Sequence, residues 1–588
     1  MPLLPLPLTL TSVREAYAAG VTVAEVLQEV FARLRALDDP GIFLHLADPD
    51  ELIAQGRALG RFDPARPLWG VPFAVKDNID VAGMPTTAAC PAWRYMAAGD
   101  AFAVARLRAA GAIPLGKTNL DQFATGLVGT RTPYPVPRNA LDRAIVPGGS
   151  SSGSGVIVGH GIVPFALGTD TAGSGRVPAA LNGIVGLKPS LGMVSASGVV
   201  PACRTLDTIS VFAREVTDAH AVLKVMAGHD PADPWSRDLP AAPLRRVPPH
   251  LRVGVPDAGS RRFFGDALQA AAFEADLAAL RARGAEIVEM DFAPFHAVAS
   301  LLYEGAWVAE RHAVIEALLA ADPGAVHPVT RQIIGKAEGL SATDAFRGLY
   351  RLAELRRACA PLIASVDMLA VPTIPTFYTV AELAADPVTP NSNLGTYTNF
   401  VNLLDLCALA VPTRPRADGR PGSLTLIAAA GQDGRLAAEA LALAGRMLPQ
   451  EAGAGEDSLE LAVCGAHMSG LPLNQQLTGL GGQFLRAAET APRYGLYVLA
   501  GGPPKRPGLV RQAEGGGSIA LEIWALPKAA LGQFIGQIPA PLGLGSVELA
   551  DGSRVTGFLC EAAGLEGARD ITALGGWRAY LAEAVAPA

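Results

Sequence analysis

Two serines in separate glycine-rich turns are the residues of this chain best suited to chemistry. Residues 147–189 read PGGSSSGSGVIVGHGIVPFALGTDTAGSGRVPAALNGIVGLKP, with Ser150 in the first turn and Ser174 in the second. Glycine permits positive φ and a close approach of the backbone, so two such turns indicate amides arranged around a ligand. A flexible linker is the alternative, but linkers do not enclose an apolar run such as IVPFALG. The segment predicts a serine hydrolase.

A serine hydroxyl becomes a nucleophile only when a base removes its proton, and no histidine here lies in a recognisable catalytic context. Lys76, in the run VPFAVKDNID, is the candidate base, because the apolar residues before it can bury its amine and keep it neutral. The alternative is a solvated ion pair with Asp77 or Asp80, which would keep the amine charged. With both serine turns present we favour the base, linked to Ser174 through the hydroxyl of Ser150.

Two short motifs offer competing interpretations. GAIPLGKT, residues 111–118, satisfies the P-loop pattern and would make Lys117 a nucleotide ligand. A P-loop needs a strand before its first glycine and a helix after its lysine, whereas here a helix precedes and a β-prone run lies inside. GSSSG, residues 149–153, fits the nucleophile elbow with Ser151 at its centre, but no apolar strand stands immediately upstream.

The combination of GGSSSGSG, GTDTAGSGR and the strand-borne lysine of VKDNID resembles the amidase signature family over about residues 8–445. The 24-residue separation of the two serines agrees with that family. The resemblance implies a mixed-sheet α/β core flanked by helices, a cis peptide at Ser150, and a Ser-Ser-Lys triad in which Ser174 attacks. It also implies an oxyanion hole formed by the backbone N–H groups of four consecutive residues: Thr171, Ala172, Gly173 and Ser174.

Two further segments, 117–135 and 464–474, are similar to those of allophanate hydrolases, which act on a small amide bearing a carboxylate. The resemblance implies that Tyr303 and Arg311 bind that carboxylate and that Gly126 presents its backbone to the substrate. On a straight helix the two side chains would stand about 12 Å and about 80° apart, so they must lean together or the helix must bend. The alternative for Arg311 is a surface salt bridge with Glu304 or Glu310.

The C-terminal part resembles the γ-glutamyl cyclotransferase-like fold, which in allophanate hydrolases disposes of the carboxylated product. His467 follows the apolar run ELAVCG in a glycine turn, a plausible place for a catalytic or carboxylate-binding imidazole. A structural histidine is the alternative. The module could instead dimerise the chain or dock a partner.

The elements that must position these residues follow an α/β pattern, in which strand-like runs alternate with helices. Two segments share one design, a helix that ends at Gly111 or Gly284 and is followed by a strand. Near residue 450 the sequence becomes small, acidic and aperiodic. We therefore expect a hydrolase domain over 1–448, a linker over 449–457, and a small β-rich α+β domain over 458–588.

Composition limits the partners. The net charge of −7, without a Lys/Arg block, gives no reason to expect nucleic acid or an anionic membrane. Six scattered cysteines without a CxxC pair favour reduced thiols in the cytoplasm, and no metal or cofactor is implied. The amino terminus is a poor signal peptide.

The family resemblance implies a homodimer and a functional link to a biotin-dependent urea carboxylase. The alternative functions are the P-loop protein, a broad-specificity amidase and one subunit of an amidotransferase.

Overall fold

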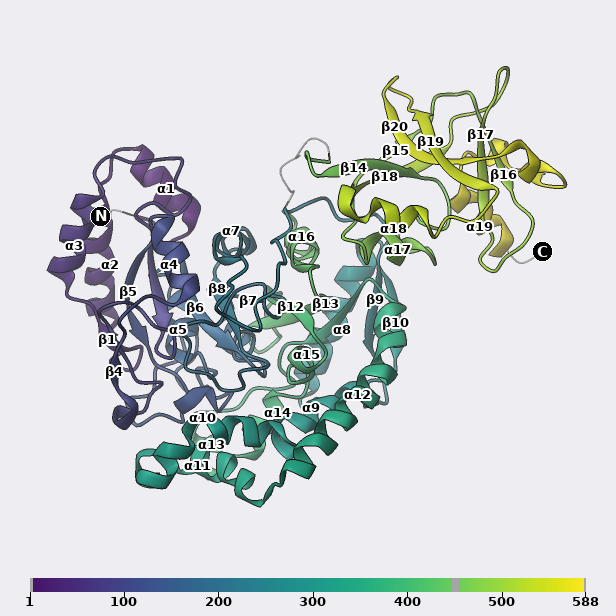
Figure 1. The fold of residues 1–588 in the computed structure, drawn as a ribbon. Coiled ribbons are helices and arrows are strands. Elements are labelled where there is room, and N and C mark those ends of the chain that lie inside the picture. Colours follow the sequence, from purple (N-terminus) through teal and green to yellow (C-terminus); the bar gives the residue numbers. More distant parts are fainter. Residues whose placement is uncertain (1–3, 447–453, 586–588) are drawn as a thin grey trace.

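The computed structural model describes residues 4–446 and 454–585, which fold into two units with separate sheets (Figure 1). The larger unit holds a mixed sheet of eleven strands, and the smaller unit begins with β14 at Ser458. Residues 449–453 of the predicted linker lie outside the described residues. The α/β class predicted for the larger unit and the β-rich character of the smaller one are both confirmed.

The large sheet has the strand order β1-β5-β2-β6-β8-β7-β12-β13-β11-β9-β10. Strand β2 pairs in parallel with β5 and β6, and β9 pairs in parallel with β10 and β11; the other neighbours are antiparallel. The strands are β1 (Phe43–Leu46), β2 (Pro72–Lys76), β5 (Ile113–Thr118), β6 (Phe165–Asp170), β7 (Val185–Lys188), β8 (Thr208–Ala213), β9 (Arg252–Pro256), β10 (Glu286–Met290), β11 (Met368–Pro372), β12 (Leu406–Thr413) and β13 (Gly422–Ala429), with a separate hairpin of β3 (Pro85–Thr86) and β4 (Tyr95–Met96).

Helices surround this sheet, and those between residues 293 and 394 gather along its lower rim in Figure 1. They are α1 (Leu10–Ala18), α2 (Val23–Leu37), α3 (Pro49–Ala58), α4 (Phe102–Ala109), α5 (Ser152–Gly159), α6 (Val177–Leu181), α7 (Val216–Met226), α8 (Ala267–Ala282), α9 (Ala293–Glu304), α10 (Trp307–Ala321), α11 (Pro328–Ile334), α12 (Ala342–Ala364), α13 (Val380–Ala385), α14 (Thr389–Leu394), α15 (Phe400–Leu403) and α16 (Asp433–Leu443).

Both predicted helix–glycine–strand units are present. Gly111, at φ +102°, separates α4 from β5, and Gly284, at φ +91°, separates α8 from β10. Strand β5 occupies the residues that a P-loop would need as its phosphate-binding loop. Lys117 is buried in that strand and donates hydrogen bonds to the Pro85 carbonyl (3.1 Å) and to Thr86 Oγ1 (2.8 Å). The structure therefore gives the P-loop interpretation no support.

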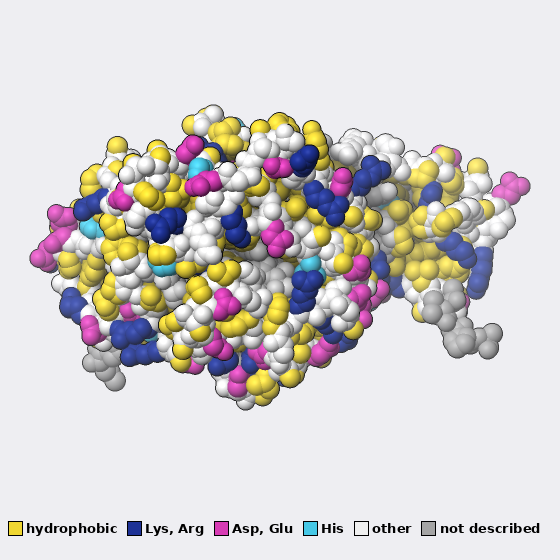
Figure 2. All heavy atoms as spheres, turned by 90° about the horizontal axis from the view of Figure 1, so that it is seen from below, with side chains coloured by type: hydrophobic (Ala, Val, Ile, Leu, Met, Phe, Trp, Pro, Cys, Tyr) yellow, Lys and Arg dark blue, Asp and Glu magenta, His cyan; other side chains and the backbone are white. Residues whose placement is uncertain are grey.

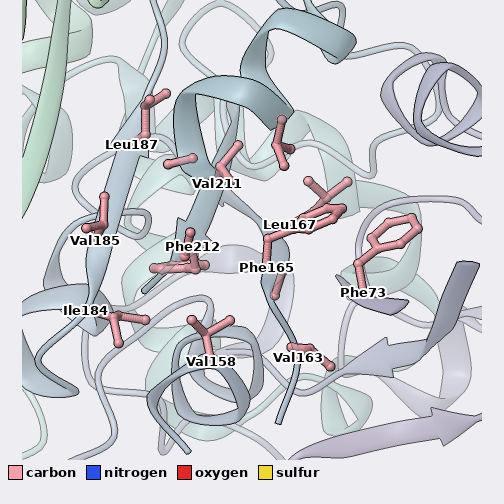
Figure 3. Close-up of a cluster of buried hydrophobic side chains, with 14 of the residues drawn as sticks. Phe73, Val158, Val163, Phe165, Leu167, Ile184, Val185, Leu187, Val211 and Phe212 are labelled. Atoms are coloured by element: carbon pink, nitrogen blue, oxygen red, sulfur yellow. The ribbon is translucent and has the colours of Figure 1, made fainter. Parts of the chain in front are cut away.

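A buried apolar cluster fixes β2, which carries Lys76, against β6, which leads into the loop of Ser174 (Figure 3). The rings of Phe73 on β2 and Phe165 on β6 stack at a centroid distance of 4.9 Å, and the two residues are register partners. Leu167 and Phe212 continue this packing along β6 and β8. Since neighbouring parallel strands end at the same edge of a sheet, the packing sets Lys76 beside the loop that follows β6.

The smaller unit contains a five-stranded sheet of order β15-β18-β14-β20-β19 and a three-stranded sheet of order β17-β16-β21. It packs beside the large unit, where Gln432 Nε2 donates to the Thr478 carbonyl at 2.8 Å. Its elements are β14 (Ser458–Val463), α17 (Asn474–Thr478), β15 (Gln483–Glu489), β16 (Tyr494–Val498), β17 (Pro507–Arg511), β18 (Ala520–Pro527), α18 (Leu531–Ile535), β19 (Leu542–Glu548), β20 (Arg554–Cys560), β21 (Arg569–Asp570) and α19 (Trp577–Val585).

Acidic and basic side chains are interspersed on the face seen in Figure 2, without a large area of one sign. No helix among the described residues is long and apolar enough to cross a membrane. All six cysteines are free thiols, and five of them are buried.

Candidate active site

Lys76 is the last residue of β2 and its side chain is fully buried. Its Nζ donates one hydrogen bond to Ser150 Oγ at 2.8 Å and another to Thr169 Oγ1 at 2.7 Å. The structure thus brings together the predicted lysine and the first predicted serine. Thr169, which lies near the end of the parallel neighbour β6, was missed from the sequence. Its place in the GTDTAGSG motif is the signal that could have identified it.

Burial lowers the pKa of Lys76 to about 7, although the charges of Asp121, Asp207 and Asp170 act to raise it. The ion-pair alternative for Lys76 is wrong in this structure. Asp77 instead lies 3.4 Å from the amine of Lys117. Asp80 accepts hydrogen bonds from the hydroxyl groups of two other side chains, Thr86 and Tyr95. A large fraction of the Lys76 amine is therefore neutral at physiological pH and able to accept a proton.

Ser150 follows a cis peptide bond from Gly149, as the resemblance implies. The Ser150 carbonyl accepts a hydrogen bond from the Asp121 N–H at 3.0 Å. A Cβ on Gly149 would lie 2.0 Å from Asp121 Oδ2, so this position requires glycine. Ser151 is the centre of the alternative nucleophile elbow. Its Oγ donates to the Thr169 carbonyl at 3.2 Å and accepts from the Thr169 N–H at 3.3 Å, so its hydroxyl is held by the backbone of β6 and does not fit a nucleophile.

Ser174 lies in the loop between β6 and α6, at the edge of the sheet where β2 ends. Its Oγ points to the carbonyl oxygen of Gly126 at 3.5 Å, at the outer limit of a hydrogen bond. No hydrogen bond joins it to Ser150 among the residues that the structure describes. Gly126 is closely packed as well, because a Cβ there would lie 2.5 Å from Asp121 Oδ2.

The loop that precedes Ser174 is folded around a buried ion pair. Asp170 accepts two hydrogen bonds from Arg176, at 2.9 Å from Nε and 3.0 Å from Nη2, and two more from the N–H groups of Gly173 (2.8 Å) and Gly175 (3.1 Å). Gly173 has φ +130°, and a Cβ there would lie 2.3 Å from Thr398 Oγ1. Because the Gly173 N–H is committed to Asp170, Gly173 is excluded from the predicted oxyanion donors in this structure.

The other predicted oxyanion residues keep their backbone donors available. Within the described chain, the N–H groups of Thr171, Ala172 and Ser174 donate no hydrogen bond. The hydroxyl of Thr171 is held by the carboxylate of Asp207, which orients this end of the loop. Three backbone donors near one serine form the arrangement that stabilises a developing oxyanion.

Tyr303 and Arg311 meet because the helix between them is broken. Helix α9 ends at Glu304 and α10 begins at Trp307, so the two side chains do not share one straight helix. The guanidinium carbon of Arg311 lies 5.2 Å from the centroid of the Tyr303 ring. Arg311 is 2% exposed, and its Nη1 donates to Thr125 Oγ1 at 3.1 Å.

Two of the remaining donors of Arg311 are left unpaired in the part of the chain that the structure describes. Its Nε and Nη2 are buried and have no hydrogen-bond partner among the described residues. The salt-bridge alternative is wrong, since Glu310 accepts instead from the backbone and hydroxyl of Thr205, each at 2.8 Å. A buried guanidinium with an unpaired edge is suited to binding a carboxylate in a bidentate manner.

His467 lies in the smaller unit and does not join the cluster around Lys76. Its ring stacks on Phe558 at 4.9 Å, and its Nε2 lies 2.9 Å from Gln476 Oε1. Burial lowers its pKa. The ring lines a cavity of about 120 Å³ that also includes Arg506. His467 thus belongs to a second candidate site.

No group of three or more His, Cys, Asp or Glu side chains in the described parts of the chain could hold a metal ion. The geometry around Lys76, Ser150 and Ser174 supplies a base, hydroxyl groups and backbone donors. Arg311 adds a buried cation. Together these groups can carry out acyl transfer on an amide that carries a negative charge.

The chemical state of Lys76 is open to direct measurement. The chain has seven lysines, so ¹³C-labelled lysine gives a simple spectrum in which Lys76→Met assigns the signal. We expect Lys76 to titrate near pH 7. Asp121→Asn should lower that midpoint, because the lost negative charge no longer favours the ammonium form. An ordinary lysine titration above about pH 10 would refute the account of burial.

Comparison with known proteins identifies the family. Residues 25–437 match the Amidase family model, and residues 459–582 match the Allophanate hydrolase C-terminal domain. The structure is similar to that of Kluyveromyces lactis allophanate hydrolase, with a TM-score of 0.76, 40% identity, and coverage of 99% of this chain and 100% of that one.

Among curated relatives, the urea amidolyase of Lachancea kluyveri is 45% identical over 548 residues, which cover 88% of this chain but only 30% of that protein. A glutamyl-tRNA(Gln) amidotransferase subunit of Nitratidesulfovibrio vulgaris is 36% identical, over 69% of this chain and 89% of that one. The matched part of the chain thus covers 30% of the length of the urea amidolyases that it resembles. It belongs to the amidase family, the hydrolases of amide bonds, and ends in an allophanate hydrolase C-terminal domain.

Proposed function

We propose that this chain hydrolyses allophanate, urea-1-carboxylate, to ammonia and carbon dioxide as a step of urea degradation. The observation that carries the proposal is the unpaired Nε–Nη2 edge of buried Arg311, which is hydrogen-bonded to Thr125, the neighbour of the Gly126 that contacts Ser174. An uncharged amide leaves this edge without an acceptor, which costs free energy. Allophanate places a carboxylate there and a carbamoyl group nearer to Ser174.

Ser174 is the proposed nucleophile. Its hydroxyl turns from the Gly126 carbonyl towards Ser150 and attacks the terminal carbamoyl carbon of the substrate. The proton of Ser174 passes to Ser150, and the proton of Ser150 passes to the lone pair of the neutral amine of Lys76, whose Nζ lies 2.8 Å from Ser150 Oγ. The base works without histidine because burial lowers the pKa of Lys76.

The carbonyl oxygen becomes an oxyanion in the tetrahedral intermediate. The N–H groups of Thr171, Ala172 and Ser174 are the proposed donors to it, and Gly173 shapes the loop instead. The intermediate collapses as the C–N bond breaks, and the proton held by Lys76 returns through Ser150 to the leaving nitrogen. Ammonia departs and an acyl group remains on Ser174. A water molecule, activated by the same relay, then releases a dicarboxylated amine and restores the serine.

The smaller unit is the proposed site where this product loses carbon dioxide, with His467 in its cavity. We propose domains over 1–448 and 458–588, joined by the linker 449–457. A homodimer, a cytoplasmic location and a functional link to a biotin-dependent urea carboxylase complete the proposal. The link is supported by the relatives named urea amidolyase, which are much longer than this chain.

A broad-specificity amidase or an amidotransferase subunit is the second candidate function. It is favoured by the relatives named as subunits of glutamyl-tRNA(Gln) amidotransferase, which match 69% and 71% of the chain. Neither alternative requires the smaller unit or a buried cation at the far end of the site. The ratio of activity on allophanate to activity on uncharged amides separates these functions, because only the proposed allophanate hydrolase prefers the carboxylated substrate.

Ser174→Ala should lower the rate of ammonia release from allophanate by more than about a thousandfold, because the attacking oxygen is lost. Ser152→Ala is the matched control, since Ser152 lies in the other serine turn and its Oγ donates to the Asn119 carbonyl at 3.2 Å. We expect the control to keep most of the activity. Equal rates for Ser174→Ala and the wild-type enzyme would reject the nucleophile.

Arg311→Gln should raise the KM for allophanate by about a hundredfold, the scale of a lost charge-assisted bidentate contact. Biuret, in which a carboxamide replaces the carboxylate, should be affected much less. Steady-state kinetics on both substrates provide the measurement. Similar losses on the two substrates would assign Arg311 a structural role and favour the uncharged-amide alternative.

A further inference from the structure

Two buried arginines meet at one threonine. Arg311 Nη1 donates to the hydroxyl oxygen of Thr125 at 3.1 Å, and Arg131 Nη1 donates to the carbonyl oxygen of the same residue at 3.0 Å. Each arginine is 2% exposed and Thr125 is fully buried. Thr125 therefore contacts both cations. Arg311 lies on helix α10, whereas Thr125 and Arg131 lie in the segment between β5 and α5.

The hydroxyl of Thr125 is fixed from both sides. It donates a hydrogen bond to the Phe123 carbonyl at 3.1 Å, so a lone pair of the oxygen is left to accept from Arg311. A hydroxyl has one donor and can accept through its oxygen, and both functions are used here. The Thr125 rotamer and the position of the Arg311 guanidinium therefore determine each other.

This contact decides which edge of Arg311 stays unpaired. With Nη1 engaged by Thr125, the free donors are Nε and Nη2, which lie on one edge of the planar group. The same edge of Arg176 holds the carboxylate of Asp170 at 2.9 and 3.0 Å. Arg311 thus presents to the site the geometry that already binds a carboxylate elsewhere in this protein.

The next residue reaches the nucleophile. The carbonyl of Gly126 faces Ser174 Oγ at 3.5 Å, and Gly126 is bonded directly to Thr125. Arg131 holds the other side of this loop, because its Nη2 donates to the Pro387 carbonyl at 2.9 Å and its N–H to Asp121 Oδ1 at 2.9 Å. One short segment therefore sets the distance between the carboxylate-binding edge and the attacking oxygen.

We propose that Thr125 is the positioning residue that makes this site specific for carboxylated amides, by holding the Arg311 guanidinium with its Nε–Nη2 edge towards the substrate. The inference rests on the proposed function of Arg311 and deepens it. Thr125 does not touch the reacting atoms. Its hydroxyl acts through Arg311, and its backbone, anchored by Arg131, acts through Gly126.

The test is Thr125→Val, which keeps the shape of the side chain and removes the hydroxyl. The readout is the ratio of kcat/KM for allophanate to kcat/KM for biuret in the full chain. We expect the ratio to fall about tenfold, the scale of one lost hydrogen bond to a charged group, and the loss to appear in KM for allophanate. Thr125→Ser, which restores a hydroxyl, should recover the wild-type ratio.

Thr330→Val is a matched control, because Thr330 is also fully buried and its hydroxyl has no hydrogen-bond partner among the described residues. Its ratio should equal that of the wild-type enzyme. If Thr125→Val fails to fold, Thr125→Ala is measured against the same criterion. An unchanged ratio, an equal loss on both substrates, or no recovery in Thr125→Ser would overturn the inference.

Arg311→Gln on the same two substrates separates this inference from the proposed function. A lower ratio in Arg311→Gln with an unchanged ratio in Thr125→Val would leave the carboxylate-binding role of Arg311 intact and overturn the role of Thr125. An unchanged ratio in both variants would overturn both.

Discussion

The structure depends on one buried amine that has no carboxylate bonded to it. Lys76 stands at the end of a strand without solvent exposure, and its two hydrogen bonds go to the hydroxyls of Ser150 and Thr169. Hydroxyl oxygens stabilise an ammonium less than a carboxylate does, so burial dominates and the pKa falls to about 7. Nearby carboxylates act on Lys76 from a distance and are bonded to other partners.

Each of those carboxylates organises backbone next to the site. Asp170 holds Arg176 and the turn around Gly173, while Asp207 holds Thr171. Asp121 accepts from two backbone N–H groups in the loop that carries Gly126. The three carboxylates near Lys76 thus hold the neighbouring loops in place through hydrogen bonds. The same arrangement leaves the Lys76 amine bonded to hydroxyl groups alone, and the N–H groups of Thr171, Ala172 and Ser174 without a partner among the described residues.

Local sequence patterns predicted much of the fold and part of the site. Gly111 and Gly284 end helices because only a residue without a side chain adopts their positive φ easily, and this signal is local. Lys76, Ser150 and Ser174 were predicted because the proposed chemistry requires those residue types. Thr169, Thr125 and Arg131 were missed. Thr169 and Thr125 contact Lys76 and Arg311, which lie 93 and 186 residues away in the chain, and Arg131 bonds to the backbone carbonyl of Thr125, which no pattern of residue types indicates.

Two further features depended on tertiary structure. The break between α9 and α10, which allows Tyr303 and Arg311 to meet, could be stated only as a requirement of geometry. The N–H of Gly173 was predicted as an oxyanion donor, but it bonds to Asp170, and that choice follows from the buried ion pair with Arg176. Sequence patterns predicted which residues belong to this candidate site. Tertiary packing determines which of their atoms remain free to bind a substrate.

The central claim is that a neutral Lys76 is the base of the free enzyme, and the pH dependence of kcat/KM for allophanate tests it most directly. Because the deprotonated amine is the active form, kcat/KM should rise with pH and reach half of its maximum near the pKa of about 7. A profile that stays flat between about pH 5.5 and about pH 8.5 would contradict the account, since no group titrating there would then control proton removal.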